Sequence, residues 1–372
     1  MVRLHSFARR LTAMVPFLLF SCVLWAQDPA LTNFHITKNS LNPAYAGYSG
    51  DLSVSLDNRM QWLAISKFRT FNTYNMAANI GCERYKLGFA VYAQDNVEGE
   101  GFLRTTNAGG QVAWYLPFDY KANGTTRRTN SSIMAFGLQL GYSQKALDWD
   151  KLTFSDQLST ETYRLVRDVS VISPQNNVTE HRLDMGAGAR FLTELGTRKR
   201  ASLSVGLAAF HVFTNQESFF GDNSDVTWPM RYNGHFFFNR QLGSKKGTRW
   251  DASFGGVYNR QVGLNNFTVM AYGAYESVLK LGVGYRGKDQ GRPDAIIIQP
   301  TLWGKDFWGG HDWLLTIGYE LTSLSSVGQH RTAGTLEFGI AILFKNSALC
   351  RTSDVHCFYP SKEMKKYSVW GY

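Results

Sequence analysis

The stretch that decides the fold is MAFGLQLGYS, residues 134–143, in which large and small side chains alternate strictly. One parity carries Met134, Phe136, Leu138, Leu140 and Tyr142, and the other carries Ala135, Gly137, Gln139, Gly141 and Ser143. A period of two is typical of a β-strand with two different faces and not of a helix. The same pattern recurs at residues 202–207, 279–286, 313–322 and 336–344. We therefore expect an all-β protein.

The second face of these strands indicates where the large residues point. In a soluble sandwich that face would be well charged, but here it consists of Gly, Ala, Ser, Thr and Gln with an occasional Glu, Lys or Arg. Small residues inside and large apolar residues outside are expected of a barrel that faces lipid. Aromatic side chains also gather at strand ends, as an interfacial girdle requires (Trp62, Trp114, Trp228, Trp250, Trp303 and Trp313). We predict a transmembrane antiparallel β-barrel; a water-soluble barrel is the alternative, because strand alternation is a weak signal.

Composition agrees with this class. The chain has 372 residues, of which 18% are charged and 14% aromatic, with 35 Gly and 9 Pro. An ordinary soluble domain has about 25% charged residues. The aromatic content excludes a disordered chain, and the lack of a long apolar run after the N-terminus excludes a helical membrane protein. The formal charge of +10 is spread along the chain, so no basic block predicts binding to nucleic acid.

The N-terminus has the pattern of a secretory signal. Arg3, Arg9 and Arg10 precede the apolar residues 14–25, and Ala26 offers a small residue at the cleavage position. A single membrane anchor fits less well because the run is short and contains Pro16. A lipoprotein modified at Cys22 also fits less well, because bulky Phe20 precedes it. We expect residues 1–26 to be removed.

About fourteen strand segments follow, in residues 51–345. They begin near Asp51, Thr70, Tyr85, Phe102, Ser131, His181, Arg200, Met230, Thr248, Asn266, Ser277, Asp294, His311 and Arg331. An even number of strands is usual in bacterial outer-membrane barrels and would place both termini in the periplasm, with residues 346–372 as a periplasmic tail. Short connections would then be periplasmic, and the long ones at 145–180 and 214–229 extracellular. The long connection at 117–130 falls on the periplasmic side and does not fit this scheme.

Motifs for catalysis or metal binding are mostly missing. The glycines of residues 282–287 match G-x-G-x-x-G, but a turn follows them where a dinucleotide site needs a helix. Glu320 and Glu337 would point inward, near Lys280 and Arg286; pairing of charges in the lumen explains them better than an acid/base site. The sequence predicts no enzyme, no cofactor and no metal.

The cysteines and one histidine near the C-terminus allow two readings. Cys350 and Cys357 with His356 make a poor zinc site, because no second cysteine pair lies nearby. A short disulfide between Cys350 and Cys357 is expected in an oxidising periplasm. Cys82 would then be free.

Several segments resemble one known family. They are residues 39–47 (NSLNPAYAG), 58–62 (NRMQW), 136–142 (FGLQLGY), 147–158 (LDWDKLTFSDQL), 231–235 (RYNGH), 282–286 (GVGYR) and 336–339 (LEFG). In these the chain is similar to the PorP/SprF family of type IX secretion outer-membrane proteins of Bacteroidota, over essentially its whole mature length. It departs from the family pattern at residues 63–66 and at Ile297 and Ile298.

The resemblance implies an integral outer-membrane barrel, not an enzyme, that anchors or helps to export a type IX secreted surface protein such as an adhesin or filament protein. A periplasmic peptidoglycan-binding protein or lipoprotein is a further possible partner, and outer-membrane lipid surrounds the barrel. A passive porin for small solutes is the alternative function.

Two segments are candidate partner-binding sites. In residues 27–50, Asn42 and Pro43 begin a turn near Tyr45, because Pro fixes φ and Gly47 permits a left-handed exit. This segment is either a tight turn leading into the first strand, or a plug or periplasmic docking element. In the loop at 145–180, Trp149, Phe154 and Tyr163 stand among charges, a mixture expected of a protein-binding surface; a loop folded into the barrel is the alternative.

Overall fold

The computed structural model describes most of the chain. It covers residues 28–66, 71–99, 101–120, 130–158, 170, 179–195, 201–213, 228–245, 248–276, 278–288, 292–307, 310–322, 332–347 and 349. The predicted signal at 1–26 and nearly all of the tail at 346–372 lie outside these residues.

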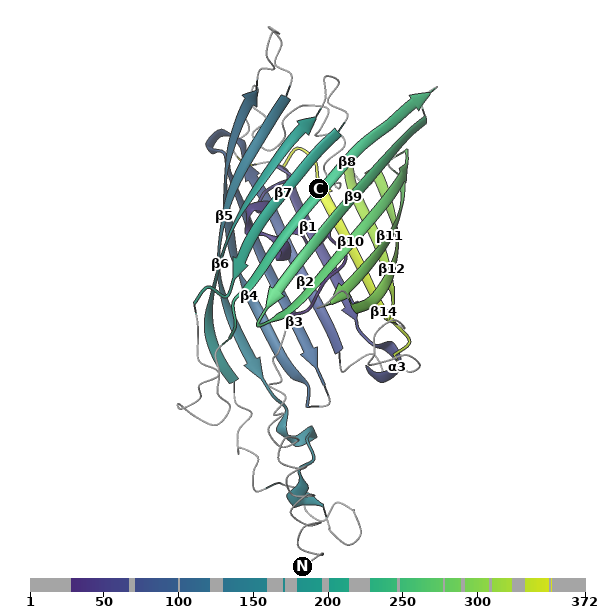
Figure 1. Cartoon of the computed structure of the whole chain (residues 1–372). Helices are drawn as coiled ribbons and strands as arrows, with labels where there is room; N and C mark the ends of the chain where they lie inside the picture. Colours follow the sequence, from purple (N-terminus) through teal and green to yellow (C-terminus); the bar gives the residue numbers. More distant parts are fainter. Residues whose placement is uncertain are drawn as a thin grey trace, which may run out of the picture.

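Fourteen antiparallel strands form a closed barrel in which each strand pairs with its neighbours in sequence (Figure 1). The strands are β1 (Leu52–Met60), β2 (Phe71–Cys82), β3 (Leu87–Glu98), β4 (Leu103–Tyr120), β5 (Asn130–Ala146), β6 (Thr179–Leu195), β7 (Ala201–Phe210), β8 (Arg231–Lys245), β9 (Thr248–Gln261), β10 (Leu264–Tyr275), β11 (Leu279–Lys288), β12 (Arg292–Phe307), β13 (His311–Leu321) and β14 (Thr335–Phe344). Closure comes from β1 and β14, which pair from Leu52↔Phe344 to Met60↔Leu336. The predicted fold class and strand number are confirmed.

Helical elements are short. They are α2 (Lys38–Leu41), η1 (Pro43–Tyr45), α3 (Leu63–Ser66), η2 (Glu83–Tyr85), η3 (Trp149–Lys151) and η4 (Ser155–Gln157). None of the helices in the described part of the chain is long and apolar enough to cross a membrane.

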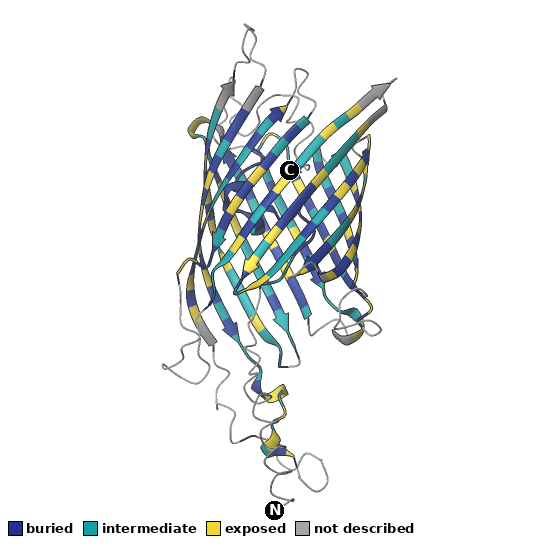
Figure 2. Cartoon of the chain, viewed as in Figure 1, coloured by how far each residue is buried: buried dark blue, intermediate teal, exposed yellow. Residues whose placement is uncertain are grey.

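Alternation along the strands separates two environments (Figure 2). Leu138 and Leu140 on β5 are 60% and 58% exposed, whereas Gln139 between them is 6% exposed. Leu207 on β7 is 69% exposed, and its neighbour Ala208 is buried. Large residues therefore face outward, where hydrocarbon would cover them, and small or polar residues face the lumen.

The two ends of the barrel differ in their connections. At the short-turn end, β2 passes into β3, β6 into β7, β8 into β9, β10 into β11 and β12 into β13. The long-loop end carries the connections between β5 and β6 and between β7 and β8. The connection expected at 117–130 is strand at both its ends, because β4 continues to Tyr120 and β5 begins at Asn130; residues 121–129 lie outside the described part of the chain. These two strands extend beyond their neighbours at the short-turn end.

Residues 28–50 lie inside the barrel and do not lead into β1 as a tight turn. All but one of residues 31–50 are buried, and Figure 1 shows this purple segment enclosed by the strands. Asp28 contacts Gln261 and His211, which lie at the long-loop end where β9 and β7 finish. The segment therefore crosses the lumen before Leu52 begins β1 at the short-turn end.

Within the described residues, the first and the last ones lie at opposite ends of the barrel. Asp28 lies at the long-loop end, whereas Leu349 pairs with Cys82 at the short-turn end. An even strand number places the start of β1 and the end of β14 on one side, as expected. The number of strands does not determine where a segment that precedes β1 begins. Because this segment crosses the lumen, Asp28 and Leu349 lie on different sides of the barrel.

Candidate functional site: a segment held in the lumen

The local fold of residues 38–50 follows from the turn-forming residues. Asn42 ends α2 and caps η1, since its Oδ1 accepts a hydrogen bond from the Ala44 N–H at 2.8 Å. Pro43 occupies the first position of η1, where its missing N–H costs nothing. Gly47 follows with φ of +66°, a left-handed conformation that favours glycine. The sequence NPAYAG thus makes a compact turn without a partner strand.

Glycines in the barrel wall make room for this turn. A Cβ on Gly137 of β5 would overlap the backbone of Pro43 and Ala44, and one on Gly188 of β6 would overlap the Asn42 side chain. A Cβ on Gly88 of β3 would overlap the Ala46 carbonyl. These three glycines face inward and form a slot, which we call the glycine slot. They explain part of the small-residue face seen in the sequence.

Asn42 and Tyr45 also bind the wall directly. Asn42 Nδ2 donates to the carbonyls of Ala189 and Leu207 at 3.0 and 3.1 Å. The Tyr45 ring is fully buried, with the Arg190 guanidinium 4.3 Å from its centroid and the His235 ring 5.4 Å away. Asn42, Pro43 and Tyr45, predicted as partner-binding residues, are all buried in contacts within the chain. In this structure the three side chains contact the barrel wall and are not accessible to another protein.

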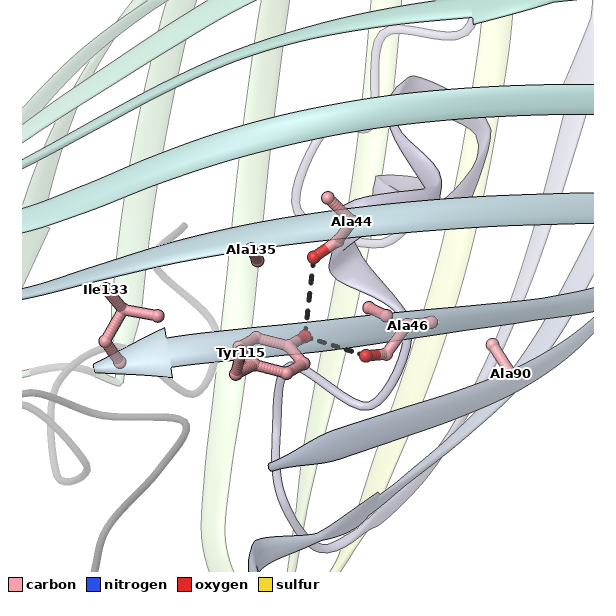
Figure 3. Packing of buried hydrophobic residues seen from close by; sticks show 7 residues of the cluster. Ala44, Ala46, Ala90, Tyr115, Ile133 and Ala135 are labelled. Atoms are coloured by element: carbon pink, nitrogen blue, oxygen red, sulfur yellow. Dashed lines mark hydrogen bonds between the residues drawn. The ribbon is translucent and has the colours of Figure 1, made fainter. Parts of the chain in front are cut away.

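An apolar cluster seals the segment toward the short-turn end (Figure 3). Tyr115 of β4 is fully buried, and its hydroxyl donates to the Ala46 carbonyl at 2.7 Å. Around it pack Ile133 of β5 and small side chains from the segment and from β3, β4 and β5 (Ala44, Ala46, Ala90, Ala113 and Ala135). The small volume of these alanines lets the segment lie close to the wall.

Side-chain amides join the segment to the wall near mid-lumen. Asn39 Nδ2 donates to Asn79 Oδ1 at 2.9 Å and to Gln111 Oε1 at 2.7 Å. Gln111 Nε2 donates to the Asn39 carbonyl at 3.0 Å and to Gln139 Oε1 at 2.7 Å. Gln139 in turn donates to Asp184 at 3.1 Å. Each buried amide is thus satisfied by another, which avoids the cost of unpaired polar groups.

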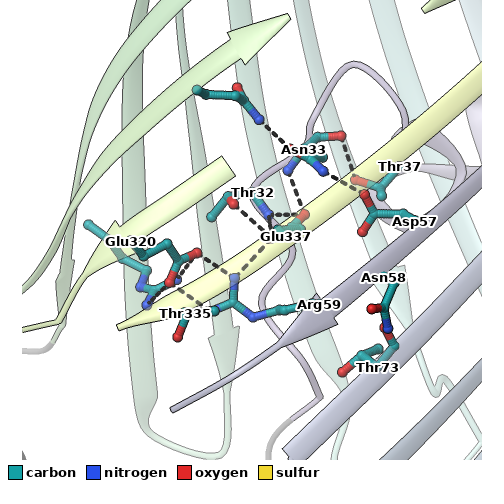
Figure 4. Close-up of polar contacts among 12 residues, drawn as sticks. Thr32, Asn33, Thr37, Asp57, Asn58, Arg59, Thr73, Glu320, Thr335 and Glu337 are labelled. Atoms are coloured by element: carbon teal, nitrogen blue, oxygen red, sulfur yellow. Dashed lines mark hydrogen bonds and ion pairs between the residues drawn. The ribbon is translucent and has the colours of Figure 1, made fainter. Parts of the chain in front are cut away.

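A buried ion cluster holds the other flank of the segment (Figure 4). Glu337 of β14 accepts hydrogen bonds from the Thr32 N–H at 3.0 Å, the Thr32 hydroxyl at 2.7 Å and the Asn33 N–H at 2.7 Å. Arg59 of β1 pairs with Glu337 at 2.9 Å and with Glu320. The prediction that Glu320 and Glu337 serve lumenal charge pairing is confirmed.

The same cluster continues along the wall. Arg286 binds Glu320 at 2.7 Å and Asp294 at 2.6 Å. Lys280, expected near the glutamates, instead contacts His35 of the segment, with 3.0 Å between Nζ and Nε2. Arg59, Glu320 and Arg286 each lie beside a group of opposite charge. Glu337 joins this cluster to Asn33, so the ion pairs help to hold the segment against the wall.

His211 anchors the first described residue at the long-loop end. Its Nε2 lies 2.7 Å from Asp28 Oδ2 and its Nδ1 lies 2.8 Å from Asp184 Oδ1. Arg231 also reaches Asp28 at 3.2 Å, and the Trp228 ring stacks on His211 at 3.8 Å between centroids. We call Asp28, His211, Asp184 and Arg231 the mouth latch.

The latch groups carry opposite charges. Burial by itself disfavours charged His211, but Asp28 and Asp184 outweigh it and raise the pKa of His211 to about 9. Burial likewise disfavours charged Asp28, but His211 and Arg231 hold its pKa well below the usual range. An imidazolium between two carboxylates is the state that this geometry stabilises.

Two small cavities lie beside the segment at this mouth, among the described residues. One cavity of about 30 Å³ lies against Asp28, Arg231 and Gln261, and another of about 20 Å³ lies against Asp28, Trp228 and Lys145. Each has room for about one water molecule.

The predicted loop residues lie apart from this site. Trp149 is buried and stacks on Phe154 at 6.1 Å between centroids. Gln157 fixes the following turn, since its Oε1 accepts from the Phe154 N–H at 2.7 Å. The structure thus brings Trp149 and Phe154 together in the loop after β5, at the long-loop end of the barrel. Tyr163 lies outside the described residues.

The cysteine prediction needs one correction. Cys82 is in a disulfide, so the expectation that it is free is wrong. The reason is tertiary: Leu349 lies beside β2, with its N–H donating to the Gly81 carbonyl at 2.9 Å, so the chain after β14 folds back onto the turn that follows β2. Cys350 and Cys357 themselves lie outside the described residues, as does His356.

In the described ranges, no three His, Cys, Asp or Glu side chains are grouped so that they could hold a metal ion. The site instead consists of hydrogen bonds, ion pairs and close packing. Sequence reasoning missed Asp28, Arg59, Asp184 and His211. A usable signal existed for Arg59 and Asp184, because each is a charged residue on the inward parity of a strand whose outward parity is mostly apolar.

Comparison with known proteins adds a family. The profile described as "Type IX secretion system membrane protein PorP/SprF" matches residues 23–341. No curated protein sequence matches significantly.

Solved structures with a similar outline are outer-membrane proteins. The chain is similar to the toluene transporter TbuX of Ralstonia pickettii, with 10% identity over 85% of this chain and 95% of that one and a TM-score of 0.45. It is also similar to the toluene transporter TodX of Pseudomonas putida (10% identity, 85% and 93% coverage, TM-score 0.37) and to a FadL homologue of Pseudomonas aeruginosa (9%, 81% and 91%, 0.38).

Proposed function

Because this chain belongs to the PorP/SprF family of type IX secretion system membrane proteins, we propose that it anchors, or helps to export, a type IX secreted cell-surface protein. The partner would be a secreted cargo such as an adhesin or filament protein. A periplasmic peptidoglycan-binding protein or lipoprotein would meet the short-turn end.

The observation that carries this proposal is the occupied lumen. Residues 31–50 are buried, the glycine slot fits them closely, and buried ion pairs hold Thr32 and Asn33. A passive porin needs a water-filled path lined by groups that face solvent. A lumen filled by the chain itself supports binding at the barrel ends over passage of small solutes through it.

Orientation is part of the proposal. Outer-membrane barrels have short periplasmic turns and longer extracellular loops. The long-loop end, with Trp149 and Phe154, would then be at the cell surface, and the short-turn end in the periplasm. Asp28 would lie at the surface mouth of the barrel.

Phe154 is the residue we propose for cargo contact, with the buried Trp149 stacked on it to hold its ring in place. They form an ordered stacked pair in a loop that also carries Asp148, Asp150 and Asp156, and aromatic residues are enriched where proteins bind one another. Leu158, which ends this turn, is 39% exposed.

The test is deletion of the gene followed by complementation. Deletion should leave one large surface protein unexported or shed into the medium, with small-solute uptake unchanged. Wild-type chain should restore attachment, and the double variant Trp149→Ala/Phe154→Ala should not. The matched control is Trp250→Ala/Phe254→Ala, which removes the same two residue types from the outward face of β9.

Two outcomes would contradict the proposal. A normal surface protein with impaired solute uptake would make the chain a porin. Full restoration by the Trp149→Ala/Phe154→Ala variant would move cargo contact away from this loop.

A further inference from the structure

The outer wall of the barrel has a hollow over β2, β3, β4 and β5. Its volume is about 750 Å³. The lining side chains that face outward are apolar: Ile80, Phe89, Val91, Val112, Leu138 and Leu140. Asn79, Gln111 and Gln139 also line the hollow, but their side chains are buried on the lumenal face. We call this hollow the wall groove.

Two small residues create the groove. Gly110 of β4 is on the outward parity between Ala108 and Val112, and a Cβ placed on it would meet only the Ala90 carbonyl, at 3.8 Å. The second small residue is Ala78 on β2, whose neighbours on the outward face of the same strand are the larger Met76 and Ile80. The groove is thus open space among large side chains and not a gap between strands, since Gly110 pairs normally with Val91 and Leu140.

The groove lies close to the short-turn end. Ile80 and Phe89 pair directly, two residues from the β2–β3 turn, where Cys82 pairs with Leu87. This turn carries Arg84, Tyr85 and Lys86, and Tyr85 is 61% exposed. Trp114, which pairs with Leu87, is 50% exposed on the same outer surface.

Aromatic side chains and basic residues next to an apolar surface mark the level of lipid headgroups. Arg84 contacts the Tyr85 ring, at 5.7 Å from its centroid. Among the side chains that the structure describes, neither Arg84 nor Lys86 has an acidic partner; Glu83 is the acidic residue of this turn in the sequence. The turn therefore offers two cations to an anion at the membrane surface.

We propose that the wall groove and the β2–β3 turn form a binding site for one anionic phospholipid, with an acyl chain in the groove and the phosphate at Arg84 and Lys86. An apolar groove in the hydrocarbon layer is filled by hydrocarbon, because water there would leave its hydrogen bonds unmade. The basic turn at one end selects the headgroup. The site lies in the periplasmic leaflet, which rests on the orientation given above and not on the cargo.

The test uses the full-length protein, stripped of lipid in detergent and returned to phosphatidylglycerol or phosphatidylethanolamine. Native mass spectrometry then counts retained lipids. We expect one retained phosphatidylglycerol on wild type. Gly110→Leu fills the groove and should reduce its occupancy about ten-fold. Gly273→Leu is the matched control, because Gly273 also faces outward on β10 and a Cβ on it meets nothing within 4 Å.

Two further variants distinguish binding of the acyl chain in the groove from binding of the headgroup at the turn. Ala78→Leu fills the groove from β2 and should act as Gly110→Leu does, even if one of them folds poorly. Arg84→Gln/Lys86→Gln should keep a bound lipid but reduce the preference for phosphatidylglycerol by about five-fold for each charge removed.

The proposal is overturned if the Gly110→Leu and Gly273→Leu variants retain phospholipid equally. It is also overturned if the lipid carried from native membranes has the mass of lipid A or of an acylated peptide. Lipid A would place the groove in the outer leaflet, and an acylated peptide would make the occupant a lipoprotein. Neither result bears on export of the surface protein, which is scored separately.

Discussion

Single glycines decide whether residues 42–47 can lie against the wall. Gly137 and Gly188 occupy inward positions where any side chain would meet the backbone or side chain of Asn42, Pro43 or Ala44. Overpacking by one side chain costs about 1–3 kcal/mol when neighbours cannot move away. Because the opposing atoms include backbone, the segment must shift to relieve it.

We predict that Gly137→Val loosens the segment. Hydrogen exchange at residues 41–47 should accelerate, and the unfolding free energy should fall by about 1–3 kcal/mol. The control is Gly273→Val on the outward face of β10, where a Cβ meets nothing within 4 Å. Equal protection of residues 41–47 in both variants would show that the wall does not hold the segment.

The mouth latch gives a pH dependence at the residue scale. The pKa of His211 is raised from 6.5 to about 9, so the stability that its charge contributes is complete below pH 6.5 and lost as pH rises through about 9. Exchange of the backbone amides of Ala30 and Leu31 should therefore accelerate above about pH 9, after correction for the intrinsic rate. His211→Gln should remove this step and expose the amides already at neutral pH. A wild-type profile without a step would contradict the charged latch.

At the scale of elements, the lumenal segment is stable because other elements satisfy it. Thr32 and Asn33 bind Glu337 of β14, Asn39 binds Gln111 of β4, and Asn42 binds carbonyls of β6 and β7. The backbone hydrogen bonds within the segment, such as those from Ser40 N–H to the Thr37 carbonyl and from Tyr48 N–H to the Tyr45 carbonyl, close only single turns. The barrel supplies the partners that a strand or helix would otherwise provide.

The chain after β14 indicates which cysteine forms the disulfide with Cys82. Cys82 is disulfide-bonded, and Leu349 lies beside Gly81 and Cys82. Because Cys350 is the next residue in the sequence, we expect it to be the partner of Cys82. Non-reducing peptide mapping should find these two peptides linked. Linkage of Cys350 to Cys357 would restore the pairing expected from sequence spacing.

At the scale of the whole molecule, the direction of the segment sets the position of the chain ends. With short turns in the periplasm, a tag between Gln27 and Asp28 should be labelled on intact cells, as should a tag at Ser159. A tag at Lys245 should be labelled only after the outer membrane is opened. Labelling of Lys245 on intact cells would reverse the barrel, and absence of label at Asp28 would contradict the traversal of the lumen.

The sequence alone determined the fold class, the number of strands and the residues near which they begin. This was possible because the two-residue period of a strand is a local pattern that can be recognised without knowing which strands pair. It also determined the inward position of Glu320 and Glu337, which follows from parity. The family resemblance on residues 39–47 and 147–158 agrees with the matched profile.

Only the tertiary structure decided what fills the barrel. Residues 28–50 have no period that marks a lumenal segment, since their partners are Glu337, Gln111 and Gly137, which are about 70 to 305 residues away in sequence. For the same reason the bonded state of Cys82 could not follow from spacing, because the chain after β14 returns to the β2–β3 turn only once the barrel has closed. The local period shows which face of a strand each residue occupies. What fills the lumen depends on contacts between distant residues that form only after the barrel has closed.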